Sequence, residues 1–168
     1  MHSTTDRRSI LLAALGGLAV AVVSGPALEA ATPKADRILV VKGERRLHLL
    51  RSGQSFRTYP IRLGSNPGGP KIFQYDGRTP EGEYVIDGRT RSTSYHLALH
   101  ISYPQPDNVA RAAKYNLPAG GGIFIHGTPG TGKRFERDWT DGCIAVSNRA
   151  IEEIWNLVDN GTPIEIRP

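Results

Sequence analysis

The sequence is poor in cysteine, methionine, aromatic residues and long apolar runs. It contains one cysteine and one methionine among 168 residues, and aromatic residues make up 7%. A single cysteine excludes an intramolecular disulfide, so a hydrophobic core must stabilise the fold. The main apolar run, Ile10 to Val23, is fourteen residues long. A run of this length is too short to cross a membrane as a helix.

Clusters of one charge are also absent. The net charge is +5, yet the basic residues are scattered and form no Lys/Arg-rich run with interleaved aromatic residues. No H-E-x-x-H or C-x-x-C motif is present. We therefore interpret the charge as a solvated surface and expect no nucleic-acid partner, no metal and no other cofactor.

One stretch imitates a nucleotide-binding loop. Gly127, Gly132 and Lys133 satisfy G-x-x-x-x-G-K, and the preceding "IFI" is typical of the strand that such a loop requires. The next residue is Arg134, so the hydroxyl that would bind Mg²⁺ is missing. We expect a glycine-rich loop here and no nucleotide partner.

The N-terminus has the pattern of a signal peptide. Arg7 and Arg8 precede the apolar run, and small residues follow it as far as "ALEAA". We predict cleavage between Ala27 and Ala31, which removes residues 1–31 and leaves a domain over 32–168 with no stable membrane span. "DRRSILLA" is similar to a twin-arginine export signal but lacks the usual Phe, so both export routes remain open. An uncleaved anchor is the alternative.

Short apolar segments separated by Gly, Pro and Asn predict a mainly β fold. Residues 37–41 and 46–50 predict a hairpin, and "EYVI" and "PIEI" predict two later strands. Residues 95–102 alternate, as expected for a strand with two different faces. The alternation places Tyr95, Leu97, Leu99 and Ile101 on one face and His96, Ala98, His100 and Ser102 on the other.

Two segments have helical patterns. Residues 107–115 predict a short helix capped by Asp107. Residues 148–158 predict a longer one that ends before Gly161. The apolar stripe of the longer helix consists of Ile151, Ile154, Trp155 and Val158. We therefore expect a β-sandwich-like domain with one or two covering helices.

The only cysteine and one histidine stand at strand ends. Cys143 follows an Asp-Gly turn and begins "CIAV". His126 directly follows "IFI", at the end of another predicted strand. The loop between them is long enough for the two strands to lie side by side. An adjacent imidazole can then take the thiol proton, which gives the thiolate and imidazolium that a cysteine nucleophile needs. The amides of Gly142 and Cys143 are candidates for an oxyanion hole, because Gly142 has no side chain.

Each of these two residues also has a simpler interpretation. A single cysteine is often buried filler, and a histidine at a strand end is often only hydrogen bonded. The pair favours catalysis, because an exported protein should avoid a free thiol that it does not need.

The stretches "GGGIFIHG", "TDGCIAVSN" and "RTPEGEYVIDGRT" resemble the L,D-transpeptidase catalytic domain of the YkuD family, and especially its YafK/DpaA-like periplasmic branch. The resemblance extends from about Arg37 to Pro168. It implies a β-sandwich-like fold, a periplasmic or cell-wall location, and peptidoglycan stem peptides as substrate. It assigns the nucleophile to Cys143 and the general base to His126, with the carbonyl of Gly127 holding the imidazole.

The sequence departs from the family pattern on both sides of the nucleophile. Most members have His or Arg before Gly-Cys and Arg two residues after the cysteine, where this chain has Asp141 and Ala145. Asp141 either favours the charged form of His126 or makes a turn. The candidate substrate-binding residues are Tyr95, His96, Arg134, Thr140 and Asp141.

The resemblance implies acyl transfer through a thioester on Cys143. An amine acceptor would give a cross-link, an exchanged D-amino acid or an attached protein, whereas water would give hydrolysis. The YafK-like branch favours hydrolysis, including release of a wall-attached lipoprotein. The alternative to an enzyme is a non-catalytic or metal-binding cell-wall module, whose candidate ligands are His96, His100, His126, Asp141 and Cys143.

Overall fold

The computed structural model describes residues 33–92, 94–128 and 137–168. The predicted signal peptide, the Gly132–Lys133 pair and Arg134 lie outside the described residues. In chain order the elements are β1 (Arg37–Val41), β2 (Arg46–Arg51), β3 (Gln54–Pro60), β4 (Gly82–Ser92), β5 (His96–Ile101), α1 (Pro106–Ala113), β6 (Phe124–His126), β7 (Ile144–Ala145), α2 (Asn148–Leu157) and β8 (Pro163–Arg167).

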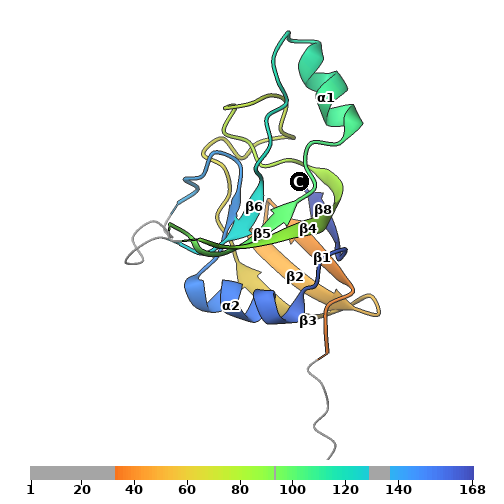
Figure 1. The fold of residues 1–168 in the computed structure, drawn as a ribbon, viewed down its shortest axis with the longest axis vertical. Coiled ribbons are helices and arrows are strands. Elements are labelled where there is room, and N and C mark those ends of the chain that lie inside the picture. Colours follow the sequence, from red (N-terminus) through yellow and green to blue (C-terminus); the bar gives the residue numbers. More distant parts are fainter. Residues whose placement is uncertain (1–32, 93, 129–136) are drawn as a thin grey trace, which may run out of the picture. The chain divides into compact units, whose positions relative to one another are not determined.

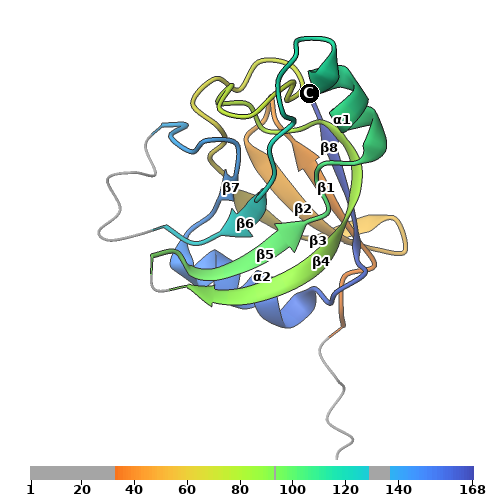
Figure 2. The same ribbon diagram turned by 45° about the horizontal axis from the view of Figure 1, so that its top comes forward.

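The strands form one strongly curved sheet in the order β3-β2-β1-β8-β4-β5-β6-β7 (Figure 1). The long strand β4 joins two halves of this sheet. Its first part pairs with β8 in one half, and its second part pairs with β5 in the other. The register shifts between Ile86 and Gly88, and a shift of this kind bends a strand. The two halves therefore fold over each other, and β4 and β5 curve visibly around the front of the molecule in Figure 2.

The chain after β3 returns to the far edge of the sheet. Arg62 and Ala145 exchange two backbone hydrogen bonds of 2.8 Å each, so this segment lies beside β7. The same segment continues to a second bridge between Gly64 and Thr140. These contacts cover the exposed edge of β7 and attach the segment before Cys143 to the rest of the fold.

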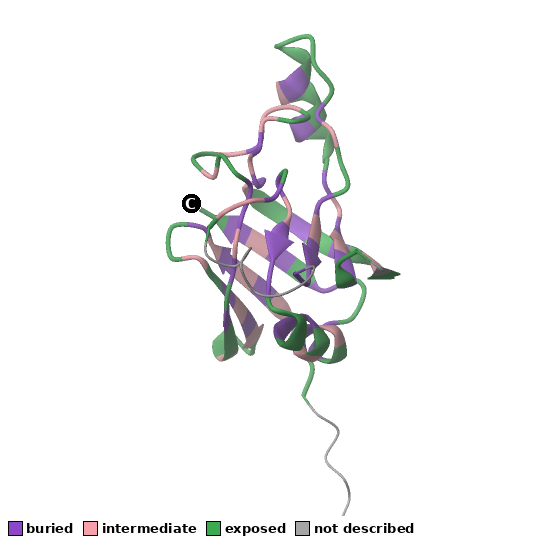
Figure 3. Ribbon diagram, turned by 90° about the vertical axis from the view of Figure 1, so that its left-hand side faces the viewer, coloured by how far each residue is buried: buried purple, intermediate pink, exposed green. Residues whose placement is uncertain are grey.

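The hydrophobic core lies between the two halves of the sheet and under α2. Alternate residues of the strands point into it, as the purple bands on the strands in Figure 3 show. Among the fully buried side chains are Ile38, Leu49, Leu99, Ile125 and Ile144. The predicted mainly β, sandwich-like fold is confirmed.

Of the two helices, α2 covers the sheet and contacts β5 and β6. Its Ser147 cap accepts a hydrogen bond from the amide of Ala150 at 3.1 Å, and Ile151 and Ile154 are fully buried. The predicted apolar stripe is thus correct. In contrast, α1 stands beyond the end of the sheet in Figure 1. The predicted cap of α1 is wrong, because the helix begins after Gln105 and Asp107 lies in its first turn.

The predicted alternation fails at the start of β5. Leu97 and Leu99 are buried in the core as expected, but His96 has a positive φ of 67° that turns the chain. Tyr95 consequently lies on the same side as Ala98, and His96 faces Glu152 of α2. No helix among the described residues is long and apolar enough to cross a membrane.

We expect Ile154→Ala to lower the free energy of unfolding by about 2 to 5 kcal/mol, because it leaves a cavity between α2 and the sheet. Urea denaturation of the described domain measures this change. Asn156→Ala, on the exposed face of the same helix, is the matched control and should change the value by less than about 0.5 kcal/mol. Equal effects of the two substitutions would show that α2 does not stabilise the core.

Candidate functional site

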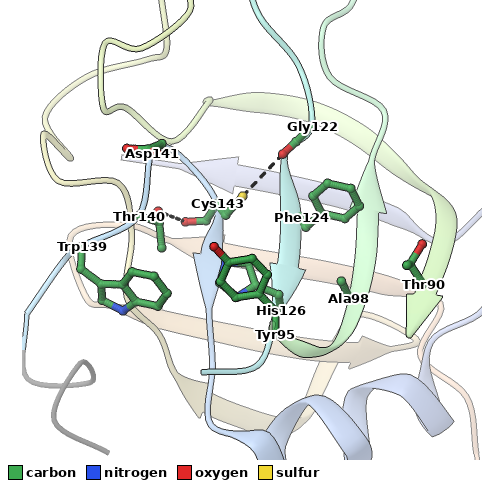
Figure 4. A pocket seen from close by; sticks show the side chains of 10 residues that line it. All are labelled: Thr90, Tyr95, Ala98, Gly122, Phe124, His126, Trp139, Thr140, Asp141 and Cys143. Carbon is green, nitrogen blue, oxygen red and sulfur yellow. Dashed lines mark hydrogen bonds between the residues drawn. The ribbon is translucent and has the colours of Figure 1, made fainter. Parts of the chain in front are cut away.

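Two short parallel strands bring His126 and Cys143 into one cavity. β6 pairs with β7 so that Ile125 faces Ile144 and His126 faces Ala145. Ile125 and Ile144 point into the core, so the residues next to them, His126 and Cys143, point to the opposite face. Figure 4 shows both side chains at the same cavity, His126 at the end of β6 and Cys143 directly before β7.

The cavity has a volume of about 380 Å³. Its wall is largely aromatic, and the only fixed charge among the described lining residues is that of Asp141. The lining residues are Thr90, Tyr95, Ala98, Gly122, Phe124, His126, Trp139, Thr140, Asp141 and Cys143. Such a cavity can hold a chain of mixed aliphatic and polar character.

The imidazole of His126 is buried, with 4% of its surface exposed, and is held in one tautomer. Its Nδ1 lies 2.6 Å from the carbonyl oxygen of Gly127, which can only accept, so Nδ1 carries the proton. Nε2 is therefore the basic nitrogen of the neutral ring. Tyr95 and Trp139 pack on this ring, with centroid distances of 4.5 and 5.8 Å. Burial lowers the pKa of His126 despite the hydrogen bond to Gly127.

Gly127 is at a position that accepts no side chain. A Cβ there would lie 2.5 Å from Oδ1 of Asn148 and 2.8 Å from the carbonyl oxygen of Tyr95. The amide of Thr128 also donates to Oδ1 of Asn148 at 2.9 Å. Close packing on this segment thus determines where the Gly127 carbonyl points, and so how the imidazole is oriented.

The thiol of Cys143 is half-buried, and its Sγ lies 3.5 Å from the carbonyl oxygen of Gly122. Among the described residues, no hydrogen bond joins this thiol to the imidazole. Burial raises the pKa of Cys143, and the nearby carboxylate of Asp141 raises it further. Burial lowers the pKa of His126 and raises that of Cys143, so it favours the neutral form of each group. The expected thiolate and imidazolium pair stays a prediction, and burial disfavours both of its charges.

Only part of the proposed oxyanion hole is open. The amide of Gly142 donates to Oγ1 of Thr140 at 3.2 Å, and this hydroxyl donates to the carbonyl of Cys143 at 2.7 Å. Within the described ranges, the amide of Cys143 donates no hydrogen bond to another residue. Gly142 could bind an oxyanion only by leaving Thr140, so the role of both amides stays a prediction.

The segment before the nucleophile is fixed by residues from distant parts of the chain. Asp138 accepts from the amide of Leu63 at 2.9 Å and pairs with Arg45 at 2.7 Å. The carbonyl of Thr140 accepts from the amide of Ser65 at 2.9 Å. These contacts place Trp139 and Thr140 in the cavity wall.

The structure brings together most of the residues that the sequence singled out. Tyr95, Thr140 and Asp141 line the cavity with Cys143 and His126. His96 lies outside it, and its Nε2 is 2.7 Å from a carboxylate oxygen of Glu152. Burial is the main cause of the lowered pKa of His126, and a role of Asp141 in favouring the imidazolium stays a prediction. Thr140 makes the turn hydrogen bonds.

Sequence reasoning missed two aromatic residues of the cavity. Phe124 lies on the same face of β6 as His126, so alternation along "IFIH" could have identified it. Trp139 lies in a loop and had no periodic signal. Within the described ranges, no group of three or more His, Cys, Asp or Glu side chains could hold a metal ion.

Comparison with known proteins gives a consistent result. A sequence model of the YkuD family, described as the L,D-transpeptidase catalytic domain, matches residues 35–166. A protein of Bacillus licheniformis named "Putative L,D-transpeptidase YkuD" is 32% identical over 136 residues, which cover 79% of this chain and 66% of that protein. These matches support the YkuD resemblance, but they do not distinguish the YafK/DpaA-like branch, which stays a prediction.

Solved structures resemble the described fold. The helical cell shape determining protein Pgp2 from Campylobacter jejuni aligns with a TM-score of 0.61 and 25% identity. Bd1075 from Bdellovibrio bacteriovorus aligns with a TM-score of 0.55 and 28% identity. Both alignments cover 77% of this chain and 46% of the other. An L,D-transpeptidase from Mycobacterium smegmatis, 15% identical with a TM-score of 0.55, shares the fold. The chain thus spans about half of the first two structures and about two thirds of the Bacillus relative.

The raised pKa of Cys143 predicts how this thiol reacts with iodoacetamide. Because burial raises the thiol pKa, the rate constant should keep rising with pH and reach no plateau below about pH 9. Intact-protein mass spectrometry measures it, and a single cysteine in the sequence makes the label specific. A plateau below about pH 7 would instead show a stable thiolate and imidazolium pair.

Proposed function

Because this chain belongs to the YkuD family of L,D-transpeptidase catalytic domains, we propose that it catalyses acyl transfer on peptidoglycan stem peptides, with Cys143 as nucleophile and His126 as base and acid. The observation that supports this most is the pairing of β6 with β7. It places a thiol and an imidazole with a free Nε2 at one cavity. Membership of the family indicates that the protein is an enzyme, whereas its substrate and its acceptor are proposed here.

The first step forms a thioester. Sγ gives its proton to Nε2 of His126 and attacks the carbonyl carbon of the third stem-peptide residue. The amide of Cys143 stabilises the oxyanion, and His126 then protonates the departing amine as the C–N bond breaks. The thiol must exchange its contact with Gly122 for one with the imidazole when substrate binds, a change that is common between free and occupied sites.

The second step transfers the acyl group to an amine. His126 takes a proton from the attacking amine, the C–S bond breaks and Cys143 regains its proton. We favour an amine over water as the acceptor, because the family is described as a transpeptidase domain. Hydrolysis and release of a lipoprotein stay alternative outcomes of the test. We place the reaction in the cell envelope, where the substrate is found and where a signal peptide over 1–31 would direct the chain.

Substitution of the two reacting residues tests the proposal. We expect Cys143→Ala to abolish turnover, since no thioester can form, and His126→Ala to slow it by about two orders of magnitude or more. The domain is incubated with isolated sacculi and defined muropeptides, and products are identified by mass spectrometry. His48→Ala, in β2, is the matched histidine control and should retain activity.

The reaction products show which acceptor the enzyme uses. New cross-links or exchanged D-amino acids that depend on Cys143 establish a transpeptidase. Addition of water, or loss of a lipoprotein peptide, establishes a hydrolase with the same nucleophile. Product formation by the Cys143→Ala variant would contradict the proposed mechanism.

A further inference from the structure

The cavity around Cys143 combines aromatic walls with a single carboxylate. Tyr95 and Trp139 stack at 6.5 Å between centroids with an interplanar angle of 26°. Phe124 adds a third ring to the lining. Aromatic faces attract cations as well as aliphatic groups, and a carboxylate adds a direct partner for a cation. The chemistry of this lining suits a substrate group with an aliphatic stem and a positively charged end.

The turn before the nucleophile does not need the carboxylate of Asp141. Thr140 supplies the side-chain hydrogen bonds of this turn, one to the amide of Gly142 and one to the carbonyl of Cys143. The side chain of Asp141 is exposed and makes no hydrogen bond or ion pair with any residue that the structure describes. Its charge is therefore available to a molecule in the cavity.

The spacing between Asp141 and Cys143 fits one type of substrate residue. Cα atoms two residues apart are separated by at most about 7 Å. A lysine-like side chain has a flexible four-carbon stem that ends in an ammonium. A donor whose carbonyl lies at Sγ can therefore extend such a side chain to the carboxylate.

We propose that Asp141 binds the side-chain ammonium of the donor residue whose carbonyl is attacked, and that the enzyme thereby selects donors in which this amine is free. The assignment rests on the proposed function, since it needs a donor peptide at Cys143. It makes Asp141 a specificity-determining residue. A donor whose side-chain amine is already acylated, as in a cross-linked stem, has no charge to offer and should be a poorer substrate.

An ammonium bound at Asp141 would also help Cys143 to lose its proton. Asp141 is one of the causes that raise the pKa of Cys143, after burial itself. Lys71 acts in the opposite direction, but its Nζ is already paired with Asp76 at 2.7 Å. An ammonium bound at Asp141 would cancel the negative charge near Sγ, so a cationic donor would favour the thiolate in its own complex.

The test compares Asp141→Asn with the unchanged domain on two peptides. The peptides have the same sequence, and one of them has an acetyl group on the side-chain amine of the donor residue. The rate of thioester formation on Cys143 is followed by intact-protein mass spectrometry. Asp107→Asn, an exposed residue in the first turn of α1, is the matched control for loss of one negative charge.

We expect the unchanged domain and Asp107→Asn to prefer the free amine by about tenfold, which corresponds to about 1.4 kcal/mol. In Asp141→Asn this preference should disappear because acylation by the free-amine peptide slows, while the acetylated peptide reacts at nearly its former rate. If all three proteins prefer the free-amine peptide to the same extent, the assignment is wrong. Iodoacetamide labelling of Cys143 shows that each variant retains an accessible thiol. If Cys143 is labelled but neither peptide acylates the unchanged domain, the proposed function fails, and the assignment fails with it.

Discussion

The site depends on the parallel pairing of β6 with β7. This pairing is short, yet its register decides which side chains face the cavity, because Ile125 and Ile144 both enter the core. A further backbone bond of 2.8 Å, from the amide of Val146 to the carbonyl of His126, extends it by one residue. A slip by one residue would turn Cys143 into the core and separate it from the imidazole. The bridges from Arg62 and Gly64 protect this register by covering the outer edge of β7.

Burial of the two reacting groups has a chemical consequence. The core that fixes their positions also removes water, so the pKa of His126 falls and that of Cys143 rises. A neutral thiol is a poorer nucleophile than a thiolate and is also less readily oxidised. Proton transfer must then be coupled to substrate binding. The carboxylate of Asp141, two residues from the sulfur, is the group through which a charged substrate would exert this effect.

Local patterns predicted the strands and the longer helix and singled out Cys143 and His126, because each of these features depends on neighbours in the chain. Alternation identified Leu97 and Leu99 as core residues, and a terminal position in "IFIH" placed His126 at a strand end. The same reasoning failed at Tyr95 and His96, because a positive φ at His96 reverses the expected faces. Trp139 could not be predicted, since Asp138 and Leu63 hold its loop through contacts distant in sequence.

The sequence by itself determined the mainly β fold and the family, and it singled out Cys143 and His126 as candidates for the reacting pair. Those features follow from periodicity and from a motif of adjacent residues. Only the tertiary structure decided the directions in which burial shifts the pKa values of Cys143 and His126, the occupation of the Gly142 amide by Thr140, and the availability of Asp141. Burial and hydrogen-bond partners come from segments far apart in the chain, and no local pattern specifies how closely they approach.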